Sequence, residues 1–186
     1  GKPVLALRVS YVGELGWELH MAAEDAVSVF ESLEGEGKPF HVGFYGAYAA
    51  NSMRLEKGYR GWGSDLTTER TPLETGLAPF VKAEGRSFVG RDAMLSKQKP
   101  WEMVLLEIEG GETDPFYSHA IFANGRSVGV VTSGAYGHRT GKTLALAFLR
   151  EPQVRDGLSV KILGRMRPAR ILATPPYDPA NERLKA

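Results

Sequence analysis

The feature that most restricts the fold is a series of short apolar segments that fills the sequence from residue 101 onward. Turn signals separate these segments at intervals of about 8–12 residues, a spacing typical of a small antiparallel barrel or sandwich. Asn124-Gly125 predicts a hairpin because both residues tolerate positive φ, and Gly164 predicts a second tight turn. The expected strands are residues 101–108, 120–123, 126–132, 144–149, 159–162 and 165–173.

The first hundred residues show a different pattern, in which helical and strand periodicities alternate. Gly35 is expected to end the first helix, and Gly58 is expected to end the second in a left-handed conformation. The Pro-rich tail from Pro175 to Pro179 is expected to lie extended on the surface. The expected strands of this part are 4–10, 17–21 and 80–82, and the expected helices are 23–33, 45–57 and 92–97.

Residues 17–21 alternate strictly between apolar and polar side chains. Successive side chains of a strand point to opposite faces, so Trp17, Leu19 and Met21 share one face. Glu18 and His20 share the other face. With the strand at 4–10, this segment predicts a hairpin that has one side open to water or to a ligand.

Together these patterns predict an α+β chain of two domains. A polar stretch from Ser96 to Pro100 follows the last helical signal, and we place the boundary there. The first domain is expected to span residues 1–98 and the second, a small antiparallel β-barrel, residues 99–186. The chain begins without Met, which suggests a domain taken from a longer protein.

Composition excludes several classes of function. The 23 Lys and Arg residues nearly balance the 22 Asp and Glu residues, so nucleic acid and anionic membranes are not expected as partners. There is no cysteine, and the four histidines form no HxH or HxxxH pair, so no metal site is predicted. No apolar run approaches the roughly 20 residues that a spanning helix needs. We expect a soluble protein of the cytoplasm, or of the mitochondrial matrix if the source is eukaryotic.

Periodicity and composition name no reaction, but several longer strings are specific. Residues 11–18, Tyr-Val-Gly-Glu-Leu-Gly-Trp-Glu, resemble a segment of the glycine cleavage T-protein family, the aminomethyltransferases. Further strings resemble the version found in the folate domains of sarcosine and dimethylglycine dehydrogenases. These are residues 51–66, 71–77, 88–95 and 132–138.

The resemblance implies the C-terminal portion of a folate-binding, partly ferredoxin-like α/β region followed by the barrel. It also implies that tetrahydrofolate is bound by Tyr11, Glu18 and Tyr59. A carboxylate at position 18 suits the adjacent N–H donors of the pterin edge, and aromatic rings provide flat walls for the pterin. Many relatives have an arginine where this chain has Ala50, so that folate contact is missing.

The implied function is transfer of a one-carbon unit from a methylated amine or aminomethyl donor to tetrahydrofolate, giving 5,10-methylenetetrahydrofolate. FAD would belong to a separate flavin domain, and a preceding region would supply the catalytic aspartate. No residue of this chain is assigned a catalytic role, and the chain alone is expected to be inactive. Two alternatives stay open, namely a non-catalytic folate-binding or assembly module and a folate-dependent demethylase.

Three other segments have a structural and a functional interpretation. Arg54 is expected to pair with a carboxylate in a structural role. Gly61-Trp62-Gly63 predicts either a tight turn with a packed tryptophan or a close approach of backbone to ligand. Residues 133–138 predict a glycine-rich surface loop in which His138 is a candidate ligand contact. The sequence identifies neither the amine substrate nor the oligomeric state.

Overall fold

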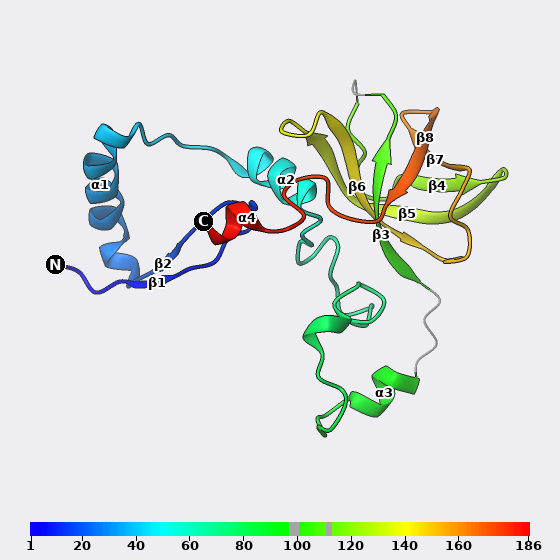
Figure 1. Ribbon diagram of the computed structural model, residues 1–186, viewed down its shortest axis with the longest axis horizontal. Helices are drawn as coiled ribbons and strands as arrows, with labels where there is room; N and C mark the ends of the chain where they lie inside the picture. The colour runs from blue at the N-terminus through cyan, green and yellow to red at the C-terminus, as the bar shows by residue number, and fades with distance from the viewer. Residues whose placement is uncertain (97–100, 111–112) are drawn as a thin grey trace.

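The structure is a computed structural model that describes residues 1–96, 101–110 and 113–186. A closed six-stranded barrel forms one end of the molecule, and a two-stranded hairpin with a helix forms the other (Figure 1). Helix α2 (Ala47–Glu56) and the short C-terminal helix α4 (Glu182–Lys185) lie between them. The fold class is therefore α+β with an antiparallel barrel, as predicted. The predicted boundary between residues 98 and 99 lies outside the described residues and stays a prediction.

The barrel strands follow the order β3-β6-β5-β4-β7-β8, and every neighbouring pair is antiparallel. Both predicted turns are confirmed: Asn124 and Gly125 have φ of 50° and 76°, and Leu163 and Gly164 have φ of 47° and 80°. The strands are β3 (Glu102–Ile108), β4 (Ala120–Ala123), β5 (Arg126–Gly137), β6 (Lys142–Leu149), β7 (Leu158–Ile162) and β8 (Arg165–Leu172).

Strand β6 is buried on both faces from Thr143 to Leu149, which agrees with the apolar run at residues 144–149. Its inward side chains join the barrel interior, where Leu106, Ile121 and Val160 are fully buried. Its outward side chains pack under Leu55 of α2, which is also fully buried. Helix α2 is therefore fixed to the barrel wall by an apolar cluster. That cluster comprises Leu55, Met103, Leu105, Ala135, Leu144, Leu146 and Phe148.

The N-terminal part contains the predicted hairpin of β1 (Leu5–Leu7) and β2 (Glu18–His20), followed by a 3-10 turn at Ala23–Asp25 and helix α1 (Ala26–Gly37). The prediction that Gly35 ends this helix was wrong. A helical glycine costs about 1 kcal/mol relative to alanine, which weakens a helix without ending it. The chain leaves the helical path in the 3-10 turn at Lys38–Phe40, after which His41 has φ of 56°.

Helix α2 ends as predicted, with Gly58 at φ of 64°. The predicted strand at 80–82 was wrong, because Ala78–Phe80 forms a 3-10 turn. Pro79 lies inside this turn, where its fixed φ suits a helical conformation and its lack of N–H removes a donor for strand pairing. The predicted helix at 92–97 is present as α3 (Arg91–Ser96).

The predicted loop at 133–138 was also wrong over most of its length. Strand β5 continues to Gly137 and pairs with β6, with a register shift between Val131 and Ser133. The glycines of this segment serve close packing. A Cβ at Gly137 would lie 2.8 Å from the Glu56 side chain, and a Cβ at Gly134 would overlap Pro115.

The tail after β8 does not lie free on the surface, contrary to the prediction. Tyr177 donates its backbone N–H to the Glu56 carbonyl at 3.2 Å. The buried Lys57 ammonium donates hydrogen bonds to the Asp178 backbone carbonyl at 2.6 Å and to Oδ1 of Asn181 at 2.7 Å. The tail therefore closes over the end of α2. Within the described ranges, no helix is both long and apolar enough to cross a membrane.

Candidate functional site

Tyr11 and Tyr59 lie together although 48 positions separate them in the sequence. Their ring centroids are 6.3 Å apart and their planes differ by 19°. Gly13 and Gly58 have positive φ and turn the chain beside each tyrosine. Tyr11 is 44% exposed and Tyr59 is half-buried, so the pair forms an aromatic surface that a flat ligand can reach.

Partial burial raises the pKa of both tyrosine hydroxyls above the ordinary value for tyrosine. At Tyr11 the nearby Arg54 opposes this shift and Asp65 adds to it. At Tyr59 the charge of Asp178 adds to the effect of burial. Both hydroxyls therefore stay protonated at neutral pH, and each can donate a hydrogen bond.

A buried ion pair contacts the backbone of one member of the tyrosine pair. Arg54 and Asp65 are 4% and 0% exposed, and Nη1 of Arg54 lies 2.5 Å from Oδ2 of Asp65. Arg54 also donates to the Tyr59 carbonyl at 2.8 Å. The pairing with a carboxylate expected for Arg54 is confirmed, and Arg54 also holds the backbone of one ligand-lining candidate.

Asp65 satisfies all its acceptor capacity inside the protein. Its Oδ2 also accepts the Gly61 backbone N–H at 2.8 Å, and its Oδ1 accepts the hydroxyls of Thr132 and Ser133 at 2.5 and 2.6 Å. Asp65 therefore connects the turn after α2 to strand β5. Sequence analysis did not single out Asp65, because its partners Thr132 and Ser133 are 67 and 68 positions away.

A second buried acid, Glu56 of α2, holds Arg139 of the β5–β6 turn at 2.6 Å. The Arg139 guanidinium reaches further, to Glu14 at 2.8 Å and to the Val12 carbonyl at 3.1 Å. It also lies 3.6 Å from the ring centroid of Tyr177, whose hydroxyl donates to Glu14. This network fixes the loop that follows Tyr11 against α2 and the barrel. No local pattern in the sequence indicates this network, because Glu56 and Arg139 are 83 positions apart.

Glu18 is not buried with the tyrosines. Its side chain is 59% exposed, and Oε2 lies 3.4 Å from Nε2 of His20 on the same face of β2. The two polar residues of this strand share one face, as the alternation predicts. The structure thus brings Tyr11 and Tyr59 together and leaves the Glu18 carboxylate largely exposed.

His138 lines a groove of about 320 Å³ between α2 and strand β5. Its ring meets that of Tyr136 edge-on at 5.1 Å. Asn51 is fixed in the same groove by donating to the Gly134 carbonyl at 3.3 Å. The tight turn expected at Gly61-Trp62-Gly63 is present, with Gly63 at φ of 90°. The expected packing of Trp62 is wrong, because its side chain is 77% exposed.

Comparison with known proteins gives a consistent result. Residues 1–85 match the family model described as GCVT N-terminal domain, and residues 102–178 match the glycine cleavage T-protein C-terminal barrel domain. Mouse mitochondrial dimethylglycine dehydrogenase is 37% identical over 98% of this chain, and the Thermus thermophilus aminomethyltransferase is 38% identical over 94%. The chain belongs to the glycine cleavage T-protein family.

A crystal structure of the glycine cleavage system aminomethyltransferase T from Bartonella henselae supports this assignment. It superposes with a TM-score of 0.82 at 26% identity, covering 94% of this chain and 50% of that one. The chain spans 22% of the length of the mouse dehydrogenase and 48% of the Thermus aminomethyltransferase. The match therefore concerns one part of these longer relatives.

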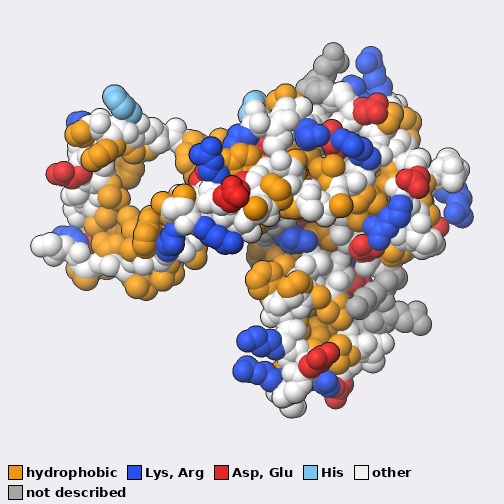
Figure 2. Space-filling model, viewed as in Figure 1, with side chains coloured by type: hydrophobic (Ala, Val, Ile, Leu, Met, Phe, Trp, Pro, Cys, Tyr) orange, Lys and Arg blue, Asp and Glu red, His pale blue; other side chains and the backbone are white. Residues whose placement is uncertain are grey.

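The N-terminal part of this T-protein family chain has an unusually apolar surface. Figure 2 shows hydrophobic side chains gathered over the hairpin and α1. No residue of α1 is buried, and Phe30 and Leu33 are both 52% exposed. Contiguous exposed apolar surface of this kind marks an interaction site. Within the residues that the structure describes, no group of acids and histidines is arranged to hold a metal ion.

Proposed function

We propose that this chain is the tetrahydrofolate-binding part of a one-carbon-transfer enzyme that forms 5,10-methylenetetrahydrofolate, linked to oxidation of sarcosine or dimethylglycine. The Tyr11–Tyr59 pair is the observation that carries the proposal. Two nearly parallel, half-exposed rings suit the flat face of a pterin, and their neutral hydroxyls can donate to its polar atoms. The similarity to dimethylglycine and sarcosine dehydrogenases supports the choice of amine.

In this proposal the chain's own residues bind and orient the folate. The exposed Glu18 carboxylate has free acceptor capacity for the paired N–H donors of the pterin edge. Arg54 and Asp65 keep Tyr59 in place, and Arg139 keeps the loop after Tyr11 in place. Tetrahydrofolate, when bound, would accept the one-carbon unit, and fixed orientation is what the chain contributes to the rate.

We further propose that the complete site includes a preceding region of a longer protein. The exposed apolar face of the hairpin and α1 would pack against that region, which would also supply the acid or base. FAD would bind in a separate domain that oxidises the amine. A mitochondrial location, if the source is eukaryotic, accords with the mitochondrial dehydrogenases that this chain resembles.

The exposed apolar face of the hairpin and α1 also suits a second candidate, a non-catalytic folate-binding or assembly module that docks partners. A folate-dependent demethylase is a third candidate, and a relative named 4-methylaminobutanoate oxidase (formaldehyde-forming) is 36% identical. Formation of methylenetetrahydrofolate from a methylated amine, assayed in a protein that includes the preceding region, separates the enzyme from the binding module. Folate binding without turnover would favour the module.

We expect Glu18→Gln to weaken reduced-folate binding about tenfold. The amide loses the charge that stabilises two adjacent donors, and such a hydrogen bond contributes about 1–3 kcal/mol. Calorimetric titration with 5-formyltetrahydrofolate measures the change in a protein that includes the preceding region. Glu31→Gln on the exposed surface of α1 is the matched control and should bind normally. An unchanged affinity for Glu18→Gln would remove this carboxylate from the site.

We expect Tyr59→Leu to weaken the same binding about three- to tenfold, since an aromatic contact is worth about 0.5–1.5 kcal/mol. Tyr59→Phe keeps the ring and should stay within about twofold of the unaltered protein if stacking is the main contribution. Quenching of intrinsic fluorescence by the folate gives both affinities. An equal loss of folate affinity in Tyr59→Leu and Tyr59→Phe would show that the hydroxyl, and not the ring, makes the contact.

A further inference from the structure

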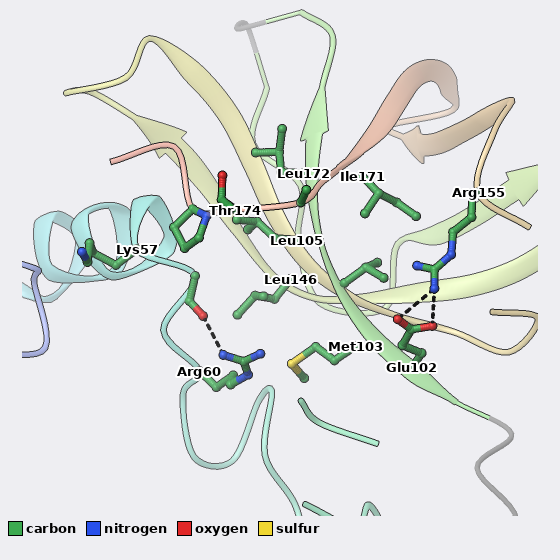
Figure 3. Close-up of a pocket in the computed structure, with 14 residues that line it drawn as sticks. Lys57, Arg60, Glu102, Met103, Leu105, Leu146, Arg155, Ile171, Leu172 and Thr174 are labelled. Atoms are coloured by element: carbon green, nitrogen blue, oxygen red, sulfur yellow. Dashed lines mark hydrogen bonds and ion pairs between the residues drawn. The ribbon is translucent and has the colours of Figure 1, made fainter. Parts of the chain in front are cut away.

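A second cleft lies where the end of α2 meets strands β3 and β8 of the barrel (Figure 3). Its volume is about 390 Å³, within the range of small-molecule sites. Met103, Leu105, Leu146 and Leu172 form an apolar wall, and Thr174 and Pro175 lie along one edge. Neither Tyr11 nor Tyr59 lines it, so this cleft is distinct from the proposed folate surface.

Two of the three cations beside the cleft are already neutralised. Arg155 holds the carboxylate of Glu102 through two contacts, at 2.7 and 3.0 Å. The Lys57 ammonium is 3.5 Å from an Asp178 carboxylate oxygen and points away from the cleft in Figure 3. These two cations are therefore committed to contacts within the protein.

Arg60 differs because its guanidinium is held only by backbone carbonyls. Nε donates to Thr75 at 2.8 Å and Nη1 donates to Gly58 at 3.2 Å. Among the described residues, no carboxylate lies within ion-pair distance of Arg60. Burial lowers the pKa of this group from its ordinary value, and the charge of Asp65 acts in the opposite direction. The positive charge is partly desolvated and has no directly paired carboxylate in the part of the chain that the structure describes.

A glycine at position 76 leaves space for the Arg60 guanidinium. Gly76 has φ of 72°, and a Cβ there would lie 2.7 Å from Nη2 of Arg60. The guanidinium therefore fits against a backbone position that only glycine leaves open. In Figure 3 the Arg60 side chain reaches toward Met103, so the positive charge lies beside the apolar wall.

We propose that this cleft binds a small organic monocarboxylate, with the carboxylate on Arg60 and the apolar part against Met103 and Leu105. A planar guanidinium can bind a carboxylate through two parallel hydrogen bonds, and the apolar wall beside it suits the organic part of such a ligand. Arg60 is the one cation of the three that is not paired with a carboxylate within the described residues, and one positive charge suits a single negative charge. The proposal does not depend on folate binding.

The test is a titration of the chain with benzoate and with benzamide, its neutral counterpart of the same shape. We follow the methyl signal of Met103 by NMR, which reports binding at the apolar wall itself. Saturable binding of benzoate, at least about tenfold tighter than that of benzamide, is expected because charge-assisted hydrogen bonds contribute about 1.5–3 kcal/mol. Equal affinities for the two probes, or no saturation by benzoate at tens of millimolar, would overturn the proposal.

Two variants and one control locate the site. Arg60→Gln should weaken benzoate binding at least about tenfold and leave benzamide unchanged. Thr174→Trp places a large ring at the exposed edge of the cleft, and should block both probes without altering the core. Arg165→Gln removes an exposed arginine at the β7–β8 turn and should bind benzoate normally. Equal weakening by Arg165→Gln, or normal binding by Thr174→Trp, would contradict the assignment.

Discussion

Replacing Asp65 by Asn is expected to lower the free energy of unfolding by about 3–5 kcal/mol. The substitution preserves the shape of the side chain but leaves the Arg54 guanidinium, 4% exposed, without its counter-charge. The amide also presents two donors where the carboxylate accepted hydrogen bonds from Gly61, Thr132 and Ser133. Urea unfolding followed by tryptophan fluorescence measures the loss.

Asp156→Asn is the matched control, because Asp156 is exposed. It should change the free energy of unfolding by no more than about 0.5 kcal/mol. A double variant, Arg54→Met with Asp65→Leu, removes both charges and should be more stable than the sum of the single losses implies. A loss below about 1 kcal/mol for Asp65→Asn would show that the pair is not buried in solution.

Replacing Glu56 by Gln is expected to lower the free energy of unfolding by about 2–3 kcal/mol, less than for Asp65 because Arg139 stays partly hydrated. Glu56 is fully buried and accepts from the backbone N–H of Arg139 and of Thr140 and from both side chains. A neutral amide cannot accept all four hydrogen bonds. Urea unfolding again gives the size of the effect.

The same substitution should also loosen the loop that follows Tyr11. Arg139 contacts the Val12 carbonyl and Glu14, and its own position depends on Glu56. Hydrogen exchange of the amides at 11–16 should therefore accelerate more than exchange within β4. Glu36→Gln, at an exposed position of α1, is the control and should leave both rates unchanged. Equal acceleration of the loop and of β4 would point to global destabilisation instead.

The barrel could be predicted from the sequence because its signals are local. Alternation sets the faces of the strands, and Asn124, Gly125 and Gly164 signal the turns because Asn and Gly tolerate positive φ. Helix α2 and its end at Gly58 could also be predicted from the sequence. Each of these features depends on neighbours within a few positions.

Several of the failed predictions arise because a glycine or proline can serve more than one structural purpose. Gly134 and Gly137 were interpreted as loop residues, but they allow Pro115 and Glu56 to approach a strand. Gly35 was interpreted as a stop but is tolerated inside α1. Only the packing around such a residue distinguishes close approach from flexibility.

Some residues of the candidate site could be predicted from the sequence, and others became apparent only in the structure. The resemblance of residues 11–18 pointed to Tyr11 and Glu18, and the stacking of Tyr11 on Tyr59 became visible only in three dimensions. The roles of Asp65, Arg139 and Arg60 could not be predicted from the sequence. Arg139 and Glu56 are 83 positions apart, and no local pattern links two charges at that separation.

Most strands and helices, the turns of the barrel and the family of the chain could be predicted from the amino-acid sequence. The pairing of charges, the crowding of glycines and the lack of a paired carboxylate at Arg60 among the described residues became visible only in the folded molecule. The difference is one of range: turns and periodicity arise between adjacent residues, whereas burial and ion pairing depend on segments that folding brings together.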